Sequence, residues 1–265
     1  MSKQMLYART PNELITLLKN NQGAKIVGGC TGSDEFPKKA ISIKQIKDFN
    51  HITRHERFLT VGPGVTLSQL LALGQNHLPQ VLFEALSSIA NPIIRNMATI
   101  GGNILASGQK HTLYAPLMAL DAKLDFKTPS DTFTESILNF KSVPQGSILT
   151  AIRIPLLDSD LSIFRRIGPE QGINELSASF AFLAKIEKNS LLGIRLTFAG
   201  PFTFHSKEFE NSLVGKRLPL SQKDVSQICE NAEVAFNKAA TDKMISDVLK
   251  QQFFNLTRYS FEQLT

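Results

Sequence analysis

Two pairs of adjacent glycines constrain the fold of this chain more than any other feature. Gly28-Gly29 follows the short stretch KIV, and Gly101-Gly102 lies inside the uncharged run TIGGNIL. Because glycine lacks a Cβ, it lets backbone N–H groups approach an anion closely and point in one direction. Threonine, serine and asparagine beside the two pairs add donors. The pattern indicates either two tight turns or two halves of a site for an anionic group such as pyrophosphate.

Composition limits the classes of protein to which the chain can belong. With 265 residues and 42% hydrophobic residues, it can bury a large core in one domain or two. The net charge of +6 comes from scattered basic residues, so we expect no nucleic-acid partner. No run approaches the roughly 18 apolar residues of a membrane span. We therefore expect no membrane partner and a cytoplasmic location.

The sequence lacks residue patterns that would let the chain carry out chemistry by itself. Cys30 and Cys229 are too few for a zinc site or an iron–sulfur cluster, so any such metal must lie on other chains. No G-x-G-x-x-G, P-loop or G-x-S-x-G motif occurs. The histidines show no metal-ligand spacing; they are His51, His55, His77, His111 and His205. A bound cofactor is the expected source of reactivity.

Local patterns predict mixed helices and strands. A helix should begin after Thr10 with a capping box completed by Glu13, and a second should follow the cap Thr66. Helices are also expected in PQVLFEALSSIANP, at the start of YAPLMALDAKLDF and from Ser221 to about residue 251. Strands are predicted at residues 25–27, in KKAISI, up to residue 61, in the second half of YAPLMALDAKLDF, and at residues 148–154, 161–167, 177–187 and 192–198. From about Ser147 the sheet should be antiparallel.

Two stretches, KIVGGCTGSDEF and NPIIRNMATIGGNI, resemble a known family. The first is similar to a loop of the form A-G-G-T-D-L and the second to I-R-N-x-A-T-x-G-G-N. Both loops are typical of the FAD-binding (medium) subunit of molybdenum hydroxylases, the xanthine dehydrogenase and carbon monoxide dehydrogenase flavoprotein family. LTVGPGVTLSQL, GSILTAIRIP and FRRIGPEQGINELSASFAFLA resemble later segments in the same order. The resemblance covers most of the chain and thins after Phe202.

The resemblance implies a fold and a domain organisation. The fold is α+β: a two-part FAD-binding domain of the vanillyl-alcohol-oxidase/PCMH type, then an α+β C-terminal domain with a three-stranded antiparallel sheet and helices. We expect the FAD-binding domain at residues 1–160, with sub-domains at about 1–55 and 56–160. The C-terminal flavoprotein domain is expected at residues 161–265.

The resemblance also implies a set of flavin contacts, with no catalytic or metal-binding side chain. The two matched loops place them at Lys25, Ile26, Val27, Gly28, Gly29, Cys30, Thr31, Gly32, Ser33, Thr99, Ile100, Gly101, Gly102 and Asn103. Ile89 falls where the family packs a residue against the flavin, and Arg165 where a basic side chain approaches it. The alternative for Arg165 and Arg166 is a surface arginine pair. Val at Gly101 or Gly102 is expected to lower FAD occupancy more than stability.

Two departures from the family pattern affect the expected cofactor site. The family usually has an Asp in an S-D-x-x-P segment shortly after the second loop, whereas SGQKHTLYAP offers His111, Thr112 or Leu113 and no carboxylate. Cys30 stands where Thr is more usual, which removes a hydroxyl donor. Both changes should weaken the hold on FAD.

The function implied by the resemblance is electron transfer within a multi-subunit molybdenum hydroxylase. Substrate would be oxidised on a molybdenum-cofactor (molybdopterin) subunit, and electrons would pass through 2Fe-2S clusters on another subunit to FAD here and then to NAD. The alternative is a degenerate structural subunit that no longer binds FAD, which the missing Asp motivates. A nucleic-acid-binding protein rests only on the pI of 9.3.

Overall fold

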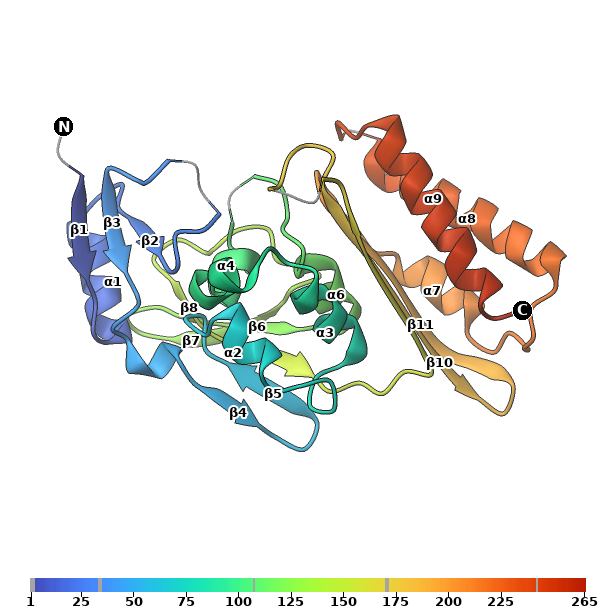
Figure 1. Ribbon diagram of the computed structural model, residues 1–265, viewed down its shortest axis with the longest axis horizontal. Helices are drawn as coiled ribbons and strands as arrows, with labels where there is room; N and C mark the ends of the chain where they lie inside the picture. Colours follow the sequence, from blue (N-terminus) through green and yellow to red (C-terminus); the bar gives the residue numbers. More distant parts are fainter. Residues whose placement is uncertain (1–2, 33–34, 107, 170–171, 242) are drawn as a thin grey trace. The chain divides into compact units, whose positions relative to one another are not determined.

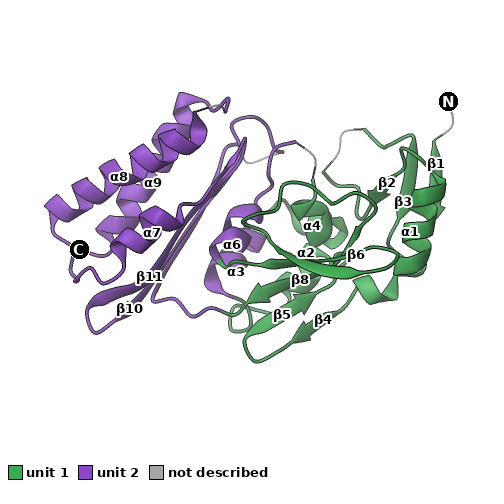
Figure 2. Ribbon diagram, turned by 180° about the vertical axis from the view of Figure 1, so that it is seen from behind, with its two compact units in different colours: residues 1–78, 89–106, 120–156 green, residues 79–88, 107–119, 157–265 purple. Residues whose placement is uncertain are grey.

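The computed structural model describes residues 3–32, 35–106, 108–169, 172–241 and 243–265 (Figure 1). By packing, the chain divides into two compact units (Figure 2). Unit 1 comprises residues 1–78, 89–106 and 120–156, and unit 2 comprises residues 79–88, 107–119 and 157–265. Unit 2 thus takes two segments from the first half of the chain. The sequence predicts two domains that meet at one boundary, at residue 160, and this boundary stays a prediction.

Unit 1 begins with a small parallel sheet of order β1-β3-β2. Its strands are β1 at Gln4–Tyr7, β3 at Lys39–Ser42 and β2 at Lys25–Val27. β2 and β3 confirm the predicted strands, whereas β1 was not predicted. On one face, Leu14 and Ile15 pack with Ile41 of β3 in a small core.

Leu14 and Ile15 belong to helix α1, Pro11–Asn20, which begins where the sequence predicts. Thr10 Oγ1 accepts a hydrogen bond from the N–H of Glu13 at 3.1 Å. The Glu13 carboxylate accepts from the N–H of Arg9 at 2.8 Å, one residue before the cap. The predicted capping box is therefore wrong in its second bond, although the helix start is confirmed.

A five-stranded antiparallel sheet of order β4-β5-β8-β6-β7 forms the rest of the frame of unit 1. The strands are β4 at Ile52–Arg54, β5 at Phe58–Val61, β6 at Lys123–Lys127, β7 at Thr132–Ser136 and β8 at Ile148–Pro155. Three of them, β5, β6 and β8, confirm predicted strands. β4 and β7 were not predicted, and antiparallel pairing begins before residue 147 because β6 already pairs with β7.

Short helices connect these strands. They are η1 at Lys47–Phe49, α2 at Leu67–Leu71, α4 at Pro92–Met97 and α5 at Ile100–Ile104. Thr66 caps α2 in a full capping box, as predicted for its start. The second glycine pair lies in α5, so it forms the first turn of a helix and not a tight turn.

Unit 2 is built on an antiparallel sheet of order β12-β11-β10-β9. The strands are β9 at Leu161–Ile167, β10 at Ala178–Glu187, β11 at Ser190–Ala199 and β12 at Thr203–Phe204. The expected C-terminal sheet has three strands, whereas this sheet has three long strands and a fourth of two residues, β12. Helix α3 at Gln80–Ser87 contacts β9, and α6 at Tyr114–Ala119 contacts β10 and β11.

Phenylalanines dominate the core of unit 2, where helices α7 at Lys207–Leu213, α8 at Gln222–Ala240 and α9 at Asp247–Glu262 pack. Phe180 and Phe182 on β10 are fully buried, as their alternation predicts. Phe236 of α8 stacks on Phe253 of α9 with ring centroids 4.0 Å apart. Among the helices in the described ranges, none has the length and apolar character needed to cross a bilayer.

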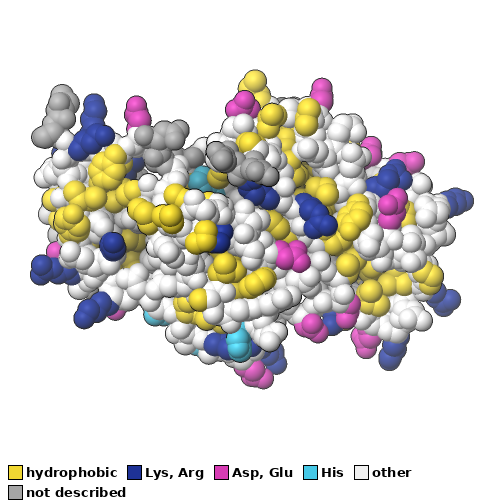
Figure 3. All heavy atoms as spheres, viewed as in Figure 1, with side chains coloured by type: hydrophobic (Ala, Val, Ile, Leu, Met, Phe, Trp, Pro, Cys, Tyr) yellow, Lys and Arg dark blue, Asp and Glu magenta, His cyan; other side chains and the backbone are white. Residues whose placement is uncertain are grey.

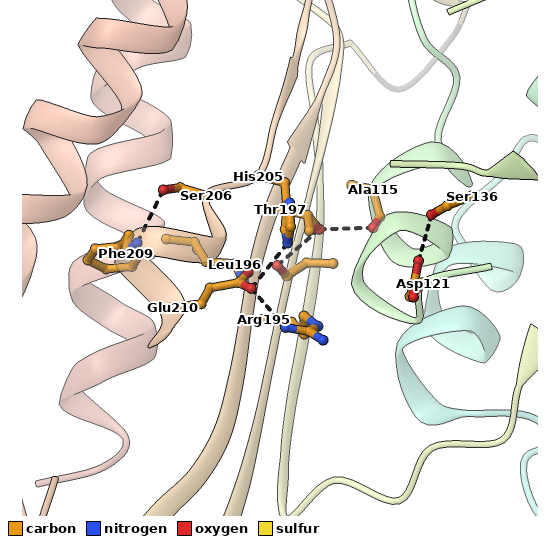
Figure 4. A network of polar contacts seen from close by, with 11 residues as sticks. Ala115, Asp121, Ser136, Arg195, Leu196, Thr197, His205, Ser206, Phe209 and Glu210 are labelled. Atoms are coloured by element: carbon orange, nitrogen blue, oxygen red, sulfur yellow. Dashed lines mark hydrogen bonds and ion pairs between the residues drawn. The ribbon is translucent and has the colours of Figure 1, made fainter. Parts of the chain in front are cut away.

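A buried carboxylate joins α7 to the sheet of unit 2 (Figure 4). Glu210 is 1% exposed and accepts hydrogen bonds from the guanidinium of Arg195 and the N–H of Leu196, both at 2.9 Å. Nε2 of His205 lies 3.1 Å from the same carboxylate. Beside this group, the Thr197 hydroxyl donates to the carbonyl of Ala115 at 2.9 Å and connects β11 to α6. Polar contacts thus fix helices to both faces of the sheet.

Candidate functional site

The first glycine loop, residues 28–32, presents backbone donors that have no acceptor among the described residues. The loop leaves β2 after Val27, whose carbonyl still accepts a sheet hydrogen bond from Ile43 at 3.1 Å. Beyond that point, no acceptor is recorded among the described residues for the amides of residues 28–32. Cys30 has φ of 55°, a left-handed conformation that reverses the direction of successive amides. This set of donors suits an anionic group.

In the second glycine loop, residues 99–103, the amides of residues 100–103 are bound within the protein. The N–H of Ile100 donates to Val65, that of Gly101 to Pro63 and that of Asn103 to Thr99, all at 3.0 Å. The N–H of Gly102 donates to Oγ1 of Thr99 at 3.1 Å. The expected open amides of this loop are therefore absent, because the start of α5 and the turn before α2 provide acceptors for them.

The two loops pack directly against each other, and this packing explains the first glycine pair. A Cβ on Gly28 would lie 2.6 Å from Oγ1 of Thr99. A Cβ on Gly29 would lie only 1.7 Å from the carbonyl oxygen of Met97, a backbone atom at the end of α4. Real Cβ atoms do not approach this closely, so glycine is required at position 29. The sequence pattern indicated ligand approach, but here glycine serves contact between the loops.

Gly101 is also fixed by packing. A Cβ there would lie 2.7 Å from both Cβ and the carbonyl oxygen of Pro63. Gly102 differs, because it is exposed and its Cβ would meet only Oγ1 of Thr99, at 3.0 Å. The two members of this pair are therefore not equivalent, and Val at Gly101 would disturb the fold as well as any ligand.

Arg95 of α4 holds the turn that precedes the second loop. Its Nη1 donates to the carbonyl of Ile89 at 2.6 Å and to that of Ala90 at 2.7 Å. Ala90 has φ of 43°, so the turn is in a conformation that non-glycine residues rarely adopt. Sequence reasoning did not single out Arg95. Its place in the quoted motif RNMATIGGN was the only available signal.

Thr99 remains able to donate to a ligand although its oxygen caps α5. It is 8% exposed, and Oγ1 accepts from Gly102. A hydroxyl can accept and donate at once. Across the part of the chain that the structure describes, no acceptor is recorded for the Thr99 hydroxyl hydrogen. It therefore adds one side-chain donor to the backbone donors of the first loop.

The structure places most predicted site residues in unit 1. Both loops and Ile89 lie there, and Ile89 is half-buried. Ser33 lies outside the described residues. Arg165 lies on β9 of unit 2, where it is exposed, donates to the carbonyl of Phe164 at 2.7 Å and has its guanidinium carbon 5.8 Å from the ring centroid of Tyr259. Arg165 thus belongs to a different unit from the loops.

A cavity of about 540 Å³ in unit 2 includes Arg165 in its lining. Helix α3 and strand β9 form it with Phe83, Glu84, Ser87, Ser88, Phe164, Arg165 and Arg166. The Ser87 and Ser88 hydroxyls donate to carbonyls of their own helix, and Arg166 donates to the carbonyl of Gly172 at 2.9 Å. Among these lining residues, Arg165 has the largest number of side-chain N–H groups left for a ligand, because its guanidinium makes one hydrogen bond within the described residues, to Phe164.

The segment that lacks the expected carboxylate is attached to the sheet of unit 2. The side-chain amide of Gln109 donates to the carbonyl of Ser177, and the N–H of Lys110 donates to Gly200 at 3.0 Å. The Lys110 ammonium lies 4.5 Å from the ring centroid of Tyr114. Burial lowers the pKa of the His111 imidazole, and the neighbouring Lys110 charge lowers it further. Burial thus favours the neutral imidazole, and the segment offers the Lys110 cation where the family pattern has an anion.

Comparison with known proteins places these loops in a family. Residues 1–157 match the family described as the FAD binding domain in molybdopterin dehydrogenase. A xanthine dehydrogenase FAD-binding subunit of Escherichia coli O157:H7 is 32% identical over 165 residues, covering 56% of each chain. A glyceraldehyde dehydrogenase medium chain of Sulfolobus acidocaldarius is 24% identical over 192 residues, covering 69% of this chain and 68% of that one. The chain thus matches little more than half the length of the first of these relatives.

Solved structures share the fold over the whole chain. A subunit in the carbon monoxide dehydrogenase of Hydrogenophaga pseudoflava has a TM-score of 0.82 at 16% identity, covering 100% of this chain and 96% of that one. The likeness supports a mixed α/β fold in common with that subunit. Since the family match spans 157 of the 265 residues, this chain belongs to the family of FAD-binding domains of molybdopterin dehydrogenases.

Proposed function

We propose that this chain binds FAD through the first glycine loop and acts as the flavoprotein subunit of a molybdenum hydroxylase. The observation that carries the proposal is the row of unbound amides at residues 28–32 beside the buried hydroxyl of Thr99. A pyrophosphate needs many donors, and the donors available here fit it. Family membership independently supports FAD binding by this chain.

The second loop has a different proposed role from the one expected. Because its amides bond to Pro63, Val65 and Thr99, it supports the first loop through Met97 and Thr99 and does not form half of an amide cradle. The Thr99 hydroxyl is its proposed direct donor to the cofactor. The side chains of Ile89 and Arg165 remain proposed flavin contacts, the second supplying positive charge.

When bound, FAD would supply the redox chemistry, because none of the described residues forms a group of side chains arranged for it. The proposed electron donor is a 2Fe-2S cluster on a partner subunit, and a molybdenum-cofactor (molybdopterin) subunit would oxidise the substrate. The proposed acceptor is NAD, with a xanthine dehydrogenase-like reaction in the cytoplasm. The residues of this chain would position FAD, exclude water and adjust the charge around it.

The two sheets of unit 1 support a two-part architecture of the vanillyl-alcohol-oxidase/PCMH type. The three-stranded sheet falls within residues 1–55. The five-stranded sheet falls within residues 56–160, except for β4, which lies just before residue 56. The first glycine loop follows β2, and the second bonds to Pro63 and Val65, which come shortly after β5. We propose that FAD binds where the loops meet, and that residues 161–265 form the C-terminal flavoprotein domain.

Calorimetric titration of the purified chain with FAD tests the proposal. Wild type should bind one FAD and show a flavin absorption spectrum. Thr31→Asp places a carboxylate among the unbound amides and should weaken FAD binding by about tenfold or more through charge repulsion. Thr53→Asp is the matched control, because Thr53 is exposed on β4 of the same unit. It should leave FAD binding unchanged.

A colourless chain that stays empty after incubation with FAD would overturn the proposal in favour of the structural subunit. Equal binding by wild type and Thr31→Asp would keep FAD but reject the first loop as its site. The acceptor is tested separately: the FAD-loaded chain, reduced under anaerobic conditions, should be reoxidised by NAD. Reoxidation by a quinone or oxygen alone would exclude NAD as the acceptor.

A further inference from the structure

Strand β1 is an edge of the three-stranded sheet with a free side. The N–H of Gln4 donates to Lys38 at 2.9 Å and that of Ala8 to Ser42 at 3.2 Å, so the even-numbered residues bond to β3. Because successive N–H groups of a strand point to opposite sides, those of Met5 and Tyr7 point away from β3. In the described ranges, no strand pairs with that side. Figures 1 and 2 both show β1 at the margin of unit 1.

The side chains of this edge are apolar and exposed. Met5 is 37% exposed and Tyr7 is 54% exposed, and both project from the same face because they are two residues apart. Leu6 projects from the opposite face and packs against the core beneath α1. Figure 3 shows hydrophobic side chains gathered over the three-stranded sheet. Proteins commonly protect such an edge by covering it, so an apolar free edge is a candidate interface.

Positive charge surrounds this edge. Lys39, the first residue of β3, pairs directly with Gln4 of β1. Lys3 precedes β1 with its ammonium 5.9 Å from the ring centroid of Phe36, and Lys38 lies just before β3, where its carbonyl accepts from Gln4 of β1. Glu35, next to Phe36 in sequence, brings one carboxylate to this end. Three lysines against one carboxylate favour an acidic partner.

The same charges disfavour a second copy of this chain. Antiparallel pairing of two β1 strands through their free sides would place Met5 opposite Tyr7 of the other copy. Lys3 would then stand opposite Arg9, and like charges directly opposite each other are destabilising. In this register, the free edge therefore fits an acidic partner strand better than it fits a second copy.

We propose that the free edge of β1 docks an extended segment of a partner protein as an added strand. The segment carries apolar side chains opposite Met5 and Tyr7 and acidic side chains opposite Lys3 and Arg9. Backbone hydrogen bonds to Met5 and Tyr7 supply affinity, and the charges at the two ends set orientation and partner choice. The inference does not depend on FAD binding.

Peptide titration of the full chain tests this docking surface. The probe is Glu-Thr-Val-Thr-Val-Thr-Glu with blocked termini, and the comparison is the same peptide with Lys at both ends. The acidic peptide should bind saturably and the Lys peptide at least about tenfold more weakly. In NMR spectra, hydrogen exchange of the Met5 and Tyr7 amides should slow, while that of Leu6 is unchanged. N-methylation of the peptide at both valines should abolish binding.

Variants of the chain complete the test. Met5→Pro removes an N–H that faces solvent, which an edge strand tolerates, and should abolish peptide binding while the chain remains folded. Tyr7→Ser should weaken binding by about tenfold. Leu192→Ser is the matched control, because Leu192 is also 54% exposed but lies on β11. It should change nothing.

Three results would overturn the proposal. The first is no binding of the acidic peptide, and the second is equal binding of the acidic and Lys peptides. The third is a dimer in solution that Tyr7→Ser converts to monomer, which would assign the edge to a second copy.

Discussion

In the first glycine loop, the amides of residues 28–32 have no acceptor among the described residues, whereas in the second the amides of residues 100–103 all bond to protein oxygens. Both loops contain a glycine pair and neighbouring hydroxyl groups. Their backbones nevertheless differ, because the first reverses direction at Cys30 and the second begins a helix. A glycine pair thus occurs both in a loop whose amides can donate to a ligand and at the start of a helix that supports that loop.

This difference shows that a glycine pair alone does not reveal what its backbone binds. In both loops a glycine is required by close packing: Gly29 against Met97, and Gly101 against Pro63. The requirement for glycine and the availability of amides are separate properties. Only the first loop combines them, and it does so because the second loop supports it. Four substitutions distinguish residues that support the loop structure from residues that donate hydrogen bonds to FAD.

Gly29→Ala should have the largest effect. Its Cβ would lie 1.7 Å from the carbonyl oxygen of Met97, so one loop must move. We expect unfolding stability to fall by about 3 kcal/mol or more, since this overlap is with backbone. Urea unfolding measures it. Gly193→Ala is the control, because no atom lies within 4 Å of its Cβ position, and it should stay within about 0.5 kcal/mol of wild type. Wild-type stability of Gly29→Ala would show that the loops do not pack as described.

Arg95→Met should have the next largest effect. It removes both bonds to Ile89 and Ala90 while keeping an unbranched side chain. Hydrogen bonds from a charged group contribute about 1.5 to 3 kcal/mol, so we expect a loss of about 2 kcal/mol and weaker FAD binding. Thermal unfolding and FAD titration measure the two effects. Arg54→Met, which removes an exposed bond to the His77 carbonyl, should cost under about 1 kcal/mol. Equal losses in both variants would argue against a special role for Arg95.

Thr99→Val should have a moderate effect on stability and a distinct effect on FAD. Loss of the helix cap costs about 1 kcal/mol. Loss of the hydroxyl hydrogen should also weaken FAD binding by about tenfold. Thr99→Ser restores both functions and should bind FAD like wild type. If Thr99→Val bound FAD normally despite lower stability, the threonine would support the loops without touching the cofactor.

Gly102→Ala should have the smallest effect. Gly102 is exposed, and its Cβ would approach only Oγ1 of Thr99, at 3.0 Å. Because its N–H is already bonded to Thr99, we expect stability within about 0.5 kcal/mol of wild type and nearly unchanged FAD affinity. This replaces the prediction from sequence that a side chain at Gly102 blocks the cofactor. A large loss of FAD binding would return the second loop to the role of an amide cradle.

Elements with a strong local signal could be predicted from the sequence. Thr10 and Thr66 mark helix starts, and the alternation of Phe180 and Phe182 marks a buried strand face. The strands β1, β4, β7 and β12 were missed; each has five residues or fewer, but so do the predicted strands β2, β3, β5 and β6, so length does not separate the two groups. Their pairing depends on neighbours that lie elsewhere in the sequence.

The candidate site shows the same division between local and distant information. Motif resemblance located both loops, because glycine and threonine spacing is a local property. The bonding of the second loop depends on Pro63 and Val65, which are more than 30 residues away in sequence. Gly29 and Met97, which meet in the structure, are even further apart in sequence. No local pattern reports which amides already have acceptors.

The most direct test of this account is an NMR titration of the isotope-labelled chain with FAD. The amide signals of residues 28–32 should shift on binding, and those of residues 100–103 should shift much less, because their hydrogen bonds already exist. Larger shifts at residues 100–103 than at residues 28–32 would contradict the assignment of donation to the first loop. Binding with no shift in either loop would place FAD elsewhere on the chain.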